Sequence, residues 1–149
     1  KFVLVMDSDF AHPPQMIQTM YEKLTNNEFE IVIGSRYVTG GKFDDWPIYR
    51  KFMSRLASTL PKFLLGLNVN DSNSGFFAIR KDLIKNLSFE AIGEKILLEI
   101  LVKTKGVKIK EIPYICKNRK EGSSKFNFLV INNYFKLLRI LLTYNRKSS

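Results

Sequence analysis

The chain opens with the apolar segment Phe2-Val3-Leu4-Val5-Met6 and continues directly into Asp7-Ser8-Asp9. A short, unbroken apolar run of this kind is typical of a strand that is covered on both faces in a parallel sheet. Pro13-Pro14 then predicts the start of an amphipathic helix. A second short strand, residues 30–33, ends in Gly34-Ser35-Arg36. This β-α-β order predicts a right-handed parallel crossover, whose loops lie at the carboxyl ends of the strands, where α/β sheets bind ligands.

The rest of the chain predicts more elements of the same α/β domain. From Pro47 a long helical pattern places apolar residues on one face, and Pro61 is expected to break or kink that helix. A second amphipathic helix at 127–144 either packs on its own sheet or lies in a membrane interface. The stripe of the first helix is Tyr49, Phe52, Met53, Leu56 and Leu60, and that of the second is Ile131, Tyr134, Phe135, Leu138, Leu141 and Leu142. Strands are predicted at 75–79 and 107–115, and helices at 80–87 and 93–103.

The composition fits one globular domain over residues 1–149. Of these residues 45% are apolar and 26% are charged, which excludes a collagen or a disordered tail. No apolar run approaches the roughly 20 residues that cross a bilayer as a helix. Cys116 is the only cysteine, so an intrachain disulfide is excluded.

The formal charge of +10 is concentrated in the last third of the chain. Residues 1–102 contain 12 Lys and Arg against 12 Asp and Glu, whereas residues 103–149 contain 12 against 2. We therefore expect an anionic partner for that end: a nucleic acid, an anionic membrane surface or a phosphorylated substrate.

Asp7 and Asp9 are the first candidates for chemistry. Two aspartates one residue apart at the end of a buried strand can converge on one hard cation. Oxygen ligands suit Mg²⁺ or Mn²⁺, which keep several waters and bind substrate phosphates at their other positions. The alternative is a turn that is capped by an Asx side chain.

These aspartates are followed by other motifs in a fixed order. They are Asp7-Ser8-Asp9-Phe10-Ala11-His12-Pro13-Pro14, Gly34-Ser35-Arg36-Tyr37, Gly40-Gly41, Trp46 with Arg50 and Ser54, Asp71 with Ser74-Gly75-Phe76, Gly93 with Glu99, and Arg119-Lys120-Glu121-Gly122-Ser123-Ser124-Lys125. Over residues 2–142 the chain resembles the family 2 glycosyltransferases of GT-A fold, and within them the dolichyl-phosphate mannosyltransferase and polyprenyl-phosphate glycosyltransferase group. The resemblance implies the C-terminal part of a GT-A domain, with a Rossmann-like, mostly parallel sheet and interface helices at about 47–67 and 127–144. The half that binds the nucleotide base and ribose in that family would precede residue 1.

The resemblance also implies a reaction. A hexose, mannose from GDP-mannose, moves to dolichyl or polyprenyl phosphate with inversion and with Mg²⁺ or Mn²⁺ as cofactor. A UDP-sugar donor such as UDP-glucose, or a soluble or polysaccharide acceptor, are the alternatives. The soluble acceptor would need a carboxylate base, for which Asp71 and Glu99 are the candidates.

The resemblance implies roles for individual residues. Asp7 and Asp9 would bind the metal and the donor diphosphate, and Arg36, Arg50 and Ser54 the acceptor phosphate. The basic loop with Arg119, Ser124 and Lys125 would close over the donor diphosphate. Asp9, Arg50 and Arg119 would act most directly in catalysis, with Asp71 and Glu99 as possible further members of the site.

The residues themselves are consistent with this chemistry. A diphosphate leaving group gains negative charge as the sugar departs, so a divalent cation and basic side chains stabilise the transition state. Arg50 and Ser54 are four residues apart on one helix face, so both can reach one phosphate. A phosphomonoester is already largely dianionic at neutral pH, so it needs no general base. His12, the only histidine, is accordingly interpreted as a structural loop residue.

Two features of the sequence modify these expectations. The family often has a polar metal-binding side chain two residues after the second aspartate, and here that residue is Ala11. The bulky apolar residues and basic tail favour peripheral association with the cytoplasmic face of a membrane. The sequence leaves open whether a membrane-anchoring subunit takes part. A basic nucleic-acid-binding module is a remote alternative, because the aromatic residues form core stripes and do not alternate with Lys and Arg.

Overall fold

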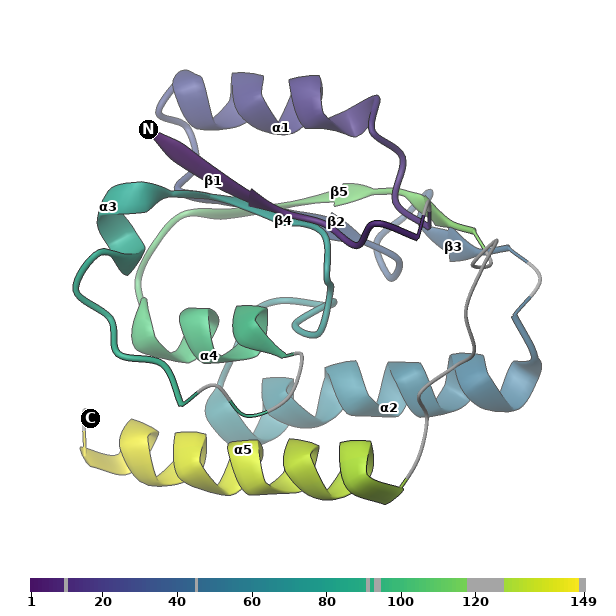
Figure 1. Ribbon diagram of the computed structural model, residues 1–149, viewed down its shortest axis with the longest axis vertical. Coiled ribbons are helices and arrows are strands. Elements are labelled where there is room, and N and C mark those ends of the chain that lie inside the picture. Colours follow the sequence, from purple (N-terminus) through teal and green to yellow (C-terminus); the bar gives the residue numbers. More distant parts are fainter. Residues whose placement is uncertain (10, 45, 91, 93–94, 118–127, 148–149) are drawn as a thin grey trace.

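The computed structural model shows an α/β fold and describes residues 1–9, 11–44, 46–90, 92, 95–117 and 128–147 (Figure 1). One helix lies on one side of a central sheet, and the longer helices lie on the other side. The elements are β1 (Phe2–Val5), α1 (Met16–Thr25), β2 (Ile31–Ser35), β3 (Lys42–Phe43), α2 (Ile48–Leu65), β4 (Phe77–Arg80), α3 (Lys81–Ile84), α4 (Ile96–Lys103), β5 (Ile109–Pro113), β6 (Ile115–Cys116) and α5 (Phe128–Lys147).

The central sheet has the strand order β1-β4-β2-β5. Strands β1 and β2 both pair antiparallel with β4, and β2 pairs parallel with β5. Three of these four strands therefore run in one direction, as expected, but β4 lies between the two strands of the predicted β-α-β unit. Phe77 of β4 is opposite both Val5 of β1 and Ile33 of β2. One residue of β4 thus aligns the two strand ends from which the candidate site begins.

Some predicted boundaries need correction. The segment predicted as one strand at 107–115 forms β5 and then β6, and β6 pairs with β3 in a separate two-stranded sheet. Helix α2 continues through Pro61 to Leu65. Proline lacks an N–H, so the carbonyl of Ala57 has no partner within the helix. Asn73 Nδ2 (2.8 Å) and the hydroxyl of Tyr134 donate to that carbonyl instead, which links α2 to α5.

Helix α5 packs on α2 and α4 and contributes Leu137, Leu138 and Leu141 to the larger hydrophobic core. The segment therefore packs into the core of its own domain, but it does so against helices α2 and α4, which lie between it and the sheet (Figure 1), and not on the sheet itself as the first alternative had it. Phe135, which the periodicity placed in the apolar stripe, is 55% exposed instead, because the buried face is rotated toward Leu137.

Most of the predicted apolar stripe of α2 faces solvent, and only Leu60 of that stripe packs against the larger hydrophobic core. Phe52 is 66% exposed, and Phe63 farther along the helix is 79% exposed. Polar Ser58 lies on the buried side of the helix. Among the described helices, none has both the length and the hydropathy to cross a membrane.

Candidate active site

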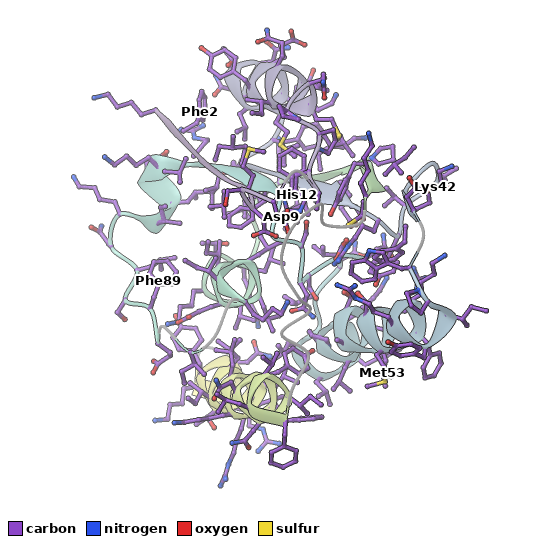
Figure 2. All side chains as sticks on the ribbon, turned by 45° about the vertical axis from the view of Figure 1, so that its right-hand side comes forward. Phe2, Asp9, His12, Lys42, Met53 and Phe89 are labelled. Carbon is purple, nitrogen blue, oxygen red and sulfur yellow. The ribbon has the colours of Figure 1, made fainter. Side chains whose placement is uncertain are left out.

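Asp7 and Asp9 follow the end of β1 after Met6, and Figure 2 shows Asp9 and His12 close together. The side chain of Asp7 is 53% exposed. Asp9 is half-buried, and its Oδ1 accepts the backbone N–H of Ala11 at 3.0 Å. This contact is the Asx turn that was the alternative interpretation. A carboxylate has about four lone-pair positions, so the turn is compatible with a metal ligand.

The donor set fits a hard divalent cation. Over the described part of the chain, no three His, Cys, Asp or Glu side chains gather in a way that could hold a metal ion. Two carboxylates are what Mg²⁺ and Mn²⁺ commonly take from a protein when substrate phosphates and water fill the other positions. Asp7 and Asp9 are therefore the side chains of the described residues that would hold the cation.

His12 is buried behind these aspartates. Its Nδ1 accepts the backbone N–H of Asp7 at 3.0 Å. The ring is stacked on Phe76, with centroids 5.0 Å apart, and meets the ring of Tyr114 edge-on. These contacts agree with the structural role expected for His12.

Arg36, at the end of β2, is held by Asp71. Its Nε and Nη2 donate to the two carboxylate oxygens at 2.8 and 2.6 Å, and its backbone N–H donates to Oδ2 at 3.0 Å. Asp71 is fully buried. Burial by itself lowers the pKa of the Arg36 guanidinium, but the hydrogen bonds and charge of Asp71 outweigh it and raise that pKa above its ordinary value. The Arg36 guanidinium therefore stays charged throughout the physiological pH range.

Asp71 belongs to a polar segment, residues 70–74, that is bonded to three neighbouring elements. Glu111 of β5 accepts the backbone N–H groups of Asn70 and Asp71 at 2.9 and 3.0 Å. Ser72 Oγ donates to the carbonyl of Ser58 in α2, and Ser74 Oγ donates to the carbonyl of Gly34 in β2. The segment fixes the position of Asp71, and through it that of Arg36.

Arg50 and Ser54 of α2 lie in what we call the arginine–aromatic cluster, which is formed by Arg36, Arg50, Arg55, Tyr37, Phe43, Trp46 and Ser54. The hydroxyl of Tyr37 donates to Ser54 Oγ at 2.7 Å. The Cζ of Arg50 is 3.7 Å from the ring centroid of Trp46, and that of Arg55 is 4.7 Å from the ring centroid of Tyr37. Cation–π contacts of this kind hold guanidinium groups over aromatic rings.

The cluster brings together the three residues that were expected to bind the acceptor phosphate. The ring of Phe43 contacts those of Tyr37 and Trp46, at centroid distances of 5.6 and 4.6 Å, and lies 5.3 Å from the Cζ of Arg36. Trp46 Nε1 is buried, and no described group accepts its hydrogen. An indole N–H and several guanidinium groups around one location suit an anion.

Glu99 does not join this site among the described residues. It is buried in α4, where its Oε1 accepts Lys103 Nζ at 2.7 Å and the backbone N–H of Glu90 at 2.8 Å. Lys103 also donates to the carbonyl of Ser88. Glu99 therefore holds α4 to the segment that precedes it. Arg119, Ser124 and Lys125, which were expected over the donor diphosphate, lie outside the described residues, as does Gly93 of the family motif.

A family model described as Glycosyl transferase family 2 matches residues 1–88. This chain belongs to glycosyl transferase family 2. Its relatives include the dolichol-phosphate mannosyltransferase of Pyrococcus furiosus, 39% identical over 143 residues that make up 95% of this chain and 40% of that protein. The Saccharomyces cerevisiae protein of the same name is 33% identical, over 97% of this chain and 56% of its own length. The undecaprenyl-phosphate mannosyltransferase of Micrococcus luteus is 34% identical, over 82% of this chain and 51% of its own length.

The chain spans about half the length of these family 2 relatives. A solved structure with the same fold is glucosyl-3-phosphoglycerate synthase from Mycobacterium tuberculosis, in complex with Mn²⁺ and UDP-glucose. The TM-score is 0.64 at 19% identity, and the match covers 95% of this chain and 48% of that one. The expected α/β fold of a GT-A glycosyltransferase is thereby confirmed.

Two contributors to this family 2 site were missed by the sequence interpretation. Tyr37 bonds to Ser54, and Glu111 holds the 70–74 segment. Tyr37 belongs to the Gly34-Ser35-Arg36-Tyr37 motif, which supported the resemblance to the family, but no role was predicted for Tyr37 itself. Glu111 gave a weaker signal, since it is one of two acidic residues in an otherwise basic last third.

Proposed function

We propose that this chain is the catalytic part of an inverting hexosyltransferase that moves mannose from GDP-mannose to dolichyl or polyprenyl phosphate. The names of the curated relatives support this activity. The observation that carries the proposal is that both carboxylates considered as a general base are already held in ion pairs. Asp71 is paired with Arg36, and Glu99 is paired with Lys103. A phosphate nucleophile needs no base, whereas a sugar hydroxyl does.

The residues of the site divide into two groups in this proposal. Asp7 and Asp9 hold Mg²⁺ or Mn²⁺, which when bound neutralises the charge that develops on the departing diphosphate. Arg36, Arg50 and Ser54 orient the phosphate of the acceptor. The Ser54 hydroxyl accepts its hydrogen bond from Tyr37, so its own hydrogen is available for a phosphate oxygen.

We further propose that the exposed face of α2 rests on the cytoplasmic face of a membrane. Ile48, Phe52, Leu56 and Phe63 are spaced by four, four and seven residues, so they form one ridge along the helix. Figure 2 shows Met53 on the outer side of α2. A ridge of this kind, with Arg55 on its flank, is suited to insertion among lipid headgroups. It would place the arginine–aromatic cluster beside the phosphate of a membrane lipid.

A transfer assay tests the proposal. The parent protein, defined as the longest natural protein that contains this chain, is incubated with Mn²⁺ or Mg²⁺, a donor and a short polyprenyl phosphate. GDP-mannose and UDP-glucose are compared as donors. We expect transfer from GDP-mannose, with loss of activity in Asp9→Ala. Transfer from UDP-glucose alone would replace mannose by glucose in the proposal.

Arg50→Ala distinguishes the acceptors. We expect kcat/KM for polyprenyl phosphate to fall by about 10- to 100-fold, since a hydrogen bond to a charged group contributes about 1.5–3 kcal/mol. The matched control is Lys51→Ala, the neighbouring basic residue of α2. Undiminished transfer by Arg50→Ala, or transfer to a soluble sugar in place of the lipid, would refute the lipid phosphate as acceptor.

A further inference from the structure

In the loop that carries Asp7 and Asp9, the first and last residues are joined by a hydrogen bond. The backbone N–H of Asp7, at the start of residues 7–12, donates to Nδ1 of His12, at the end. Within the loop, Ala11 N–H donates to Asp9 Oδ1. The carboxylates therefore lie in a turn that depends on two side-chain acceptors, one of which is the imidazole of His12.

The position of the His12 ring is determined from outside the loop. His12 is 4% exposed, and its ring is stacked on Phe76 with an interplanar angle of 12°. The ring of Tyr114 meets it edge-on at 5.5 Å. The imidazole is thus held by residues next to β4 and β5, and it cannot turn without disturbing the core. Because Nδ1 accepts a backbone N–H, the neutral ring carries its proton on Nε2.

The residues around the His12 ring also restrict the positions that the Asp7 carboxylate can take. His12 Nε2 is 4.0 Å from Asp7 Oδ2. On another side, a Cβ built onto Gly75 would lie 3.3 Å from the same oxygen. Gly75 immediately precedes Phe76, the residue on which His12 is stacked. One segment therefore supports the imidazole and also bounds the carboxylate.

We propose that His12 is a positioning residue, which fixes the Asp7 carboxylate for a divalent cation through its bond to the Asp7 peptide N–H. The inference rests on the proposed function of Asp7 as a metal ligand. Groups that orient a metal ligand from behind commonly change metal affinity by about 10- to 100-fold when they are removed. His12 would act in this way without touching metal or substrate.

Three substitutions separate the effect of the hydrogen bond at Nδ1 from the effect of the packing of the His12 ring. His12→Asn keeps an acceptor at the δ position, His12→Gln keeps a polar group at the ε position only, and His12→Ala keeps neither. Leu24→Ala is the matched control, because Leu24 belongs to the same hydrophobic core as Phe76 and has no contact with Asp7 among those that the structure describes. Leu24→Ala shows how a general loss of core packing affects Mn²⁺ affinity.

The measurement is Mn²⁺ binding to the parent protein, followed by electron paramagnetic resonance of free Mn²⁺ in the presence of GDP and, separately, UDP. Thermal unfolding is recorded for the same variants. We expect the Kd for Mn²⁺ to rise by about 10-fold or more in His12→Ala and His12→Gln, and by less than about 3-fold in His12→Asn. Leu24→Ala should lower the unfolding temperature without changing that Kd.

Other results would overturn the proposal. If His12→Ala binds Mn²⁺ as the wild type does, the ring is only part of the core. If His12→Asn loses affinity as fully as His12→Ala, ring packing matters and the Nδ1 acceptor does not. A wild type that binds no Mn²⁺ would refute the metal site and the role of His12 together. Intact Mn²⁺ binding without transfer to polyprenyl phosphate would refute only the proposed acceptor.

Discussion

Asp71 holds both the guanidinium and the backbone N–H of Arg36, so the arginine is fixed at three hydrogen atoms by one buried carboxylate. The charge of Arg36 is thereby neutralised, and what remains for a ligand is its unused N–H donors. The other guanidinium groups of the cluster, those of Arg50 and Arg55, lie over the rings of Trp46 and Tyr37. The site thus combines one arginine that is held by a buried carboxylate with two that are stacked on aromatic rings.

Removing one partner of this buried pair should be costly. Asp71→Asn leaves Arg36 without its counter-ion, and we expect the free energy of unfolding to fall by about 3–5 kcal/mol. The double variant Arg36→Met/Asp71→Leu should be less destabilised than Asp71→Asn, because it removes both charges together. Denaturant unfolding of Asp71→Asn and of the double variant measures this. Asp82→Asn, in the exposed pair with Arg80, is the control, and an equal loss there would contradict the buried-pair explanation.

Tyr37 and Ser54 should act as one unit. Tyr37→Phe removes the hydrogen bond to Ser54, and we expect the KM for polyprenyl phosphate to rise by about 5-fold, the equivalent of about 1 kcal/mol. Adding Tyr37→Phe to Ser54→Ala should cause little further change, because the bond is already lost. Tyr49→Phe, an exposed tyrosine of α2, is the kinetic control. Additive effects of the two changes would show that Tyr37 acts independently of Ser54.

The exposed ridge of α2 should carry membrane binding. Replacing Phe52 and Phe63 by glutamate places one charge within the ridge and one at its end, so sedimentation with vesicles of phosphatidylcholine and phosphatidylglycerol should decrease strongly. Circular dichroism should remain that of the wild type, since both positions face solvent. The control is Tyr21→Glu on α1, on the opposite side of the sheet (Figure 1). If it reduces sedimentation as much, the ridge has no special role.

The protein should lose stability at alkaline pH. Burial raises the pKa of the Tyr114 and Tyr134 hydroxyls and of the Cys116 thiol above their ordinary values. The folded state therefore keeps these protons at a pH where the unfolded chain has released them. Folding stability is complete below the ordinary values and falls as pH rises above about 9 for the thiol and about 10 for the phenols.

Thermal unfolding between pH 7 and pH 11 measures this dependence. Tyr114→Phe removes one ionisable group while keeping the ring, so its unfolding temperature should decline less steeply with pH than that of the wild type. A wild-type unfolding temperature that stays constant up to pH 11 would contradict the prediction. The same outcome would show that the buried hydroxyls ionise at their ordinary pH in the folded state.

Local signals in the sequence located the ends of β1 and β2 to within two residues. Met6-Asp7 follows the end of β1, whereas Gly34-Ser35, which were expected after the strand at 30–33, are the last two residues of β2, and the two strand ends lie at the same end of the sheet. The periodicity of α2 gave the correct stripe, but a stripe does not tell which side is buried. In this helix the polar Ser58 faces the interior, because it bonds to the 70–74 segment.

The partners of the acidic residues could not be predicted in the same way. Asp71 and Glu99 are ordinary carboxylates in the sequence, and a free base cannot be told from a paired one without knowing the neighbours. Asp71 meets Arg36 from 35 positions away, whereas Glu99 meets Lys103 one helical turn later. The second pair follows a familiar i,i+4 spacing and could have been expected. The first depends on the tertiary fold alone.

The position of β4 between β1 and β2 also bears on how the protein reaches its native state. Because Phe77 is opposite Val5 and Ile33, the ends of β1 and β2 acquire their final separation only when a strand from beyond α2 is inserted between them. Closing so long a loop is entropically unfavourable, and such pairings slow folding. Asp7 and Arg36 should therefore come together late and in the same kinetic step, so that partly folded chains have neither half of the site in place.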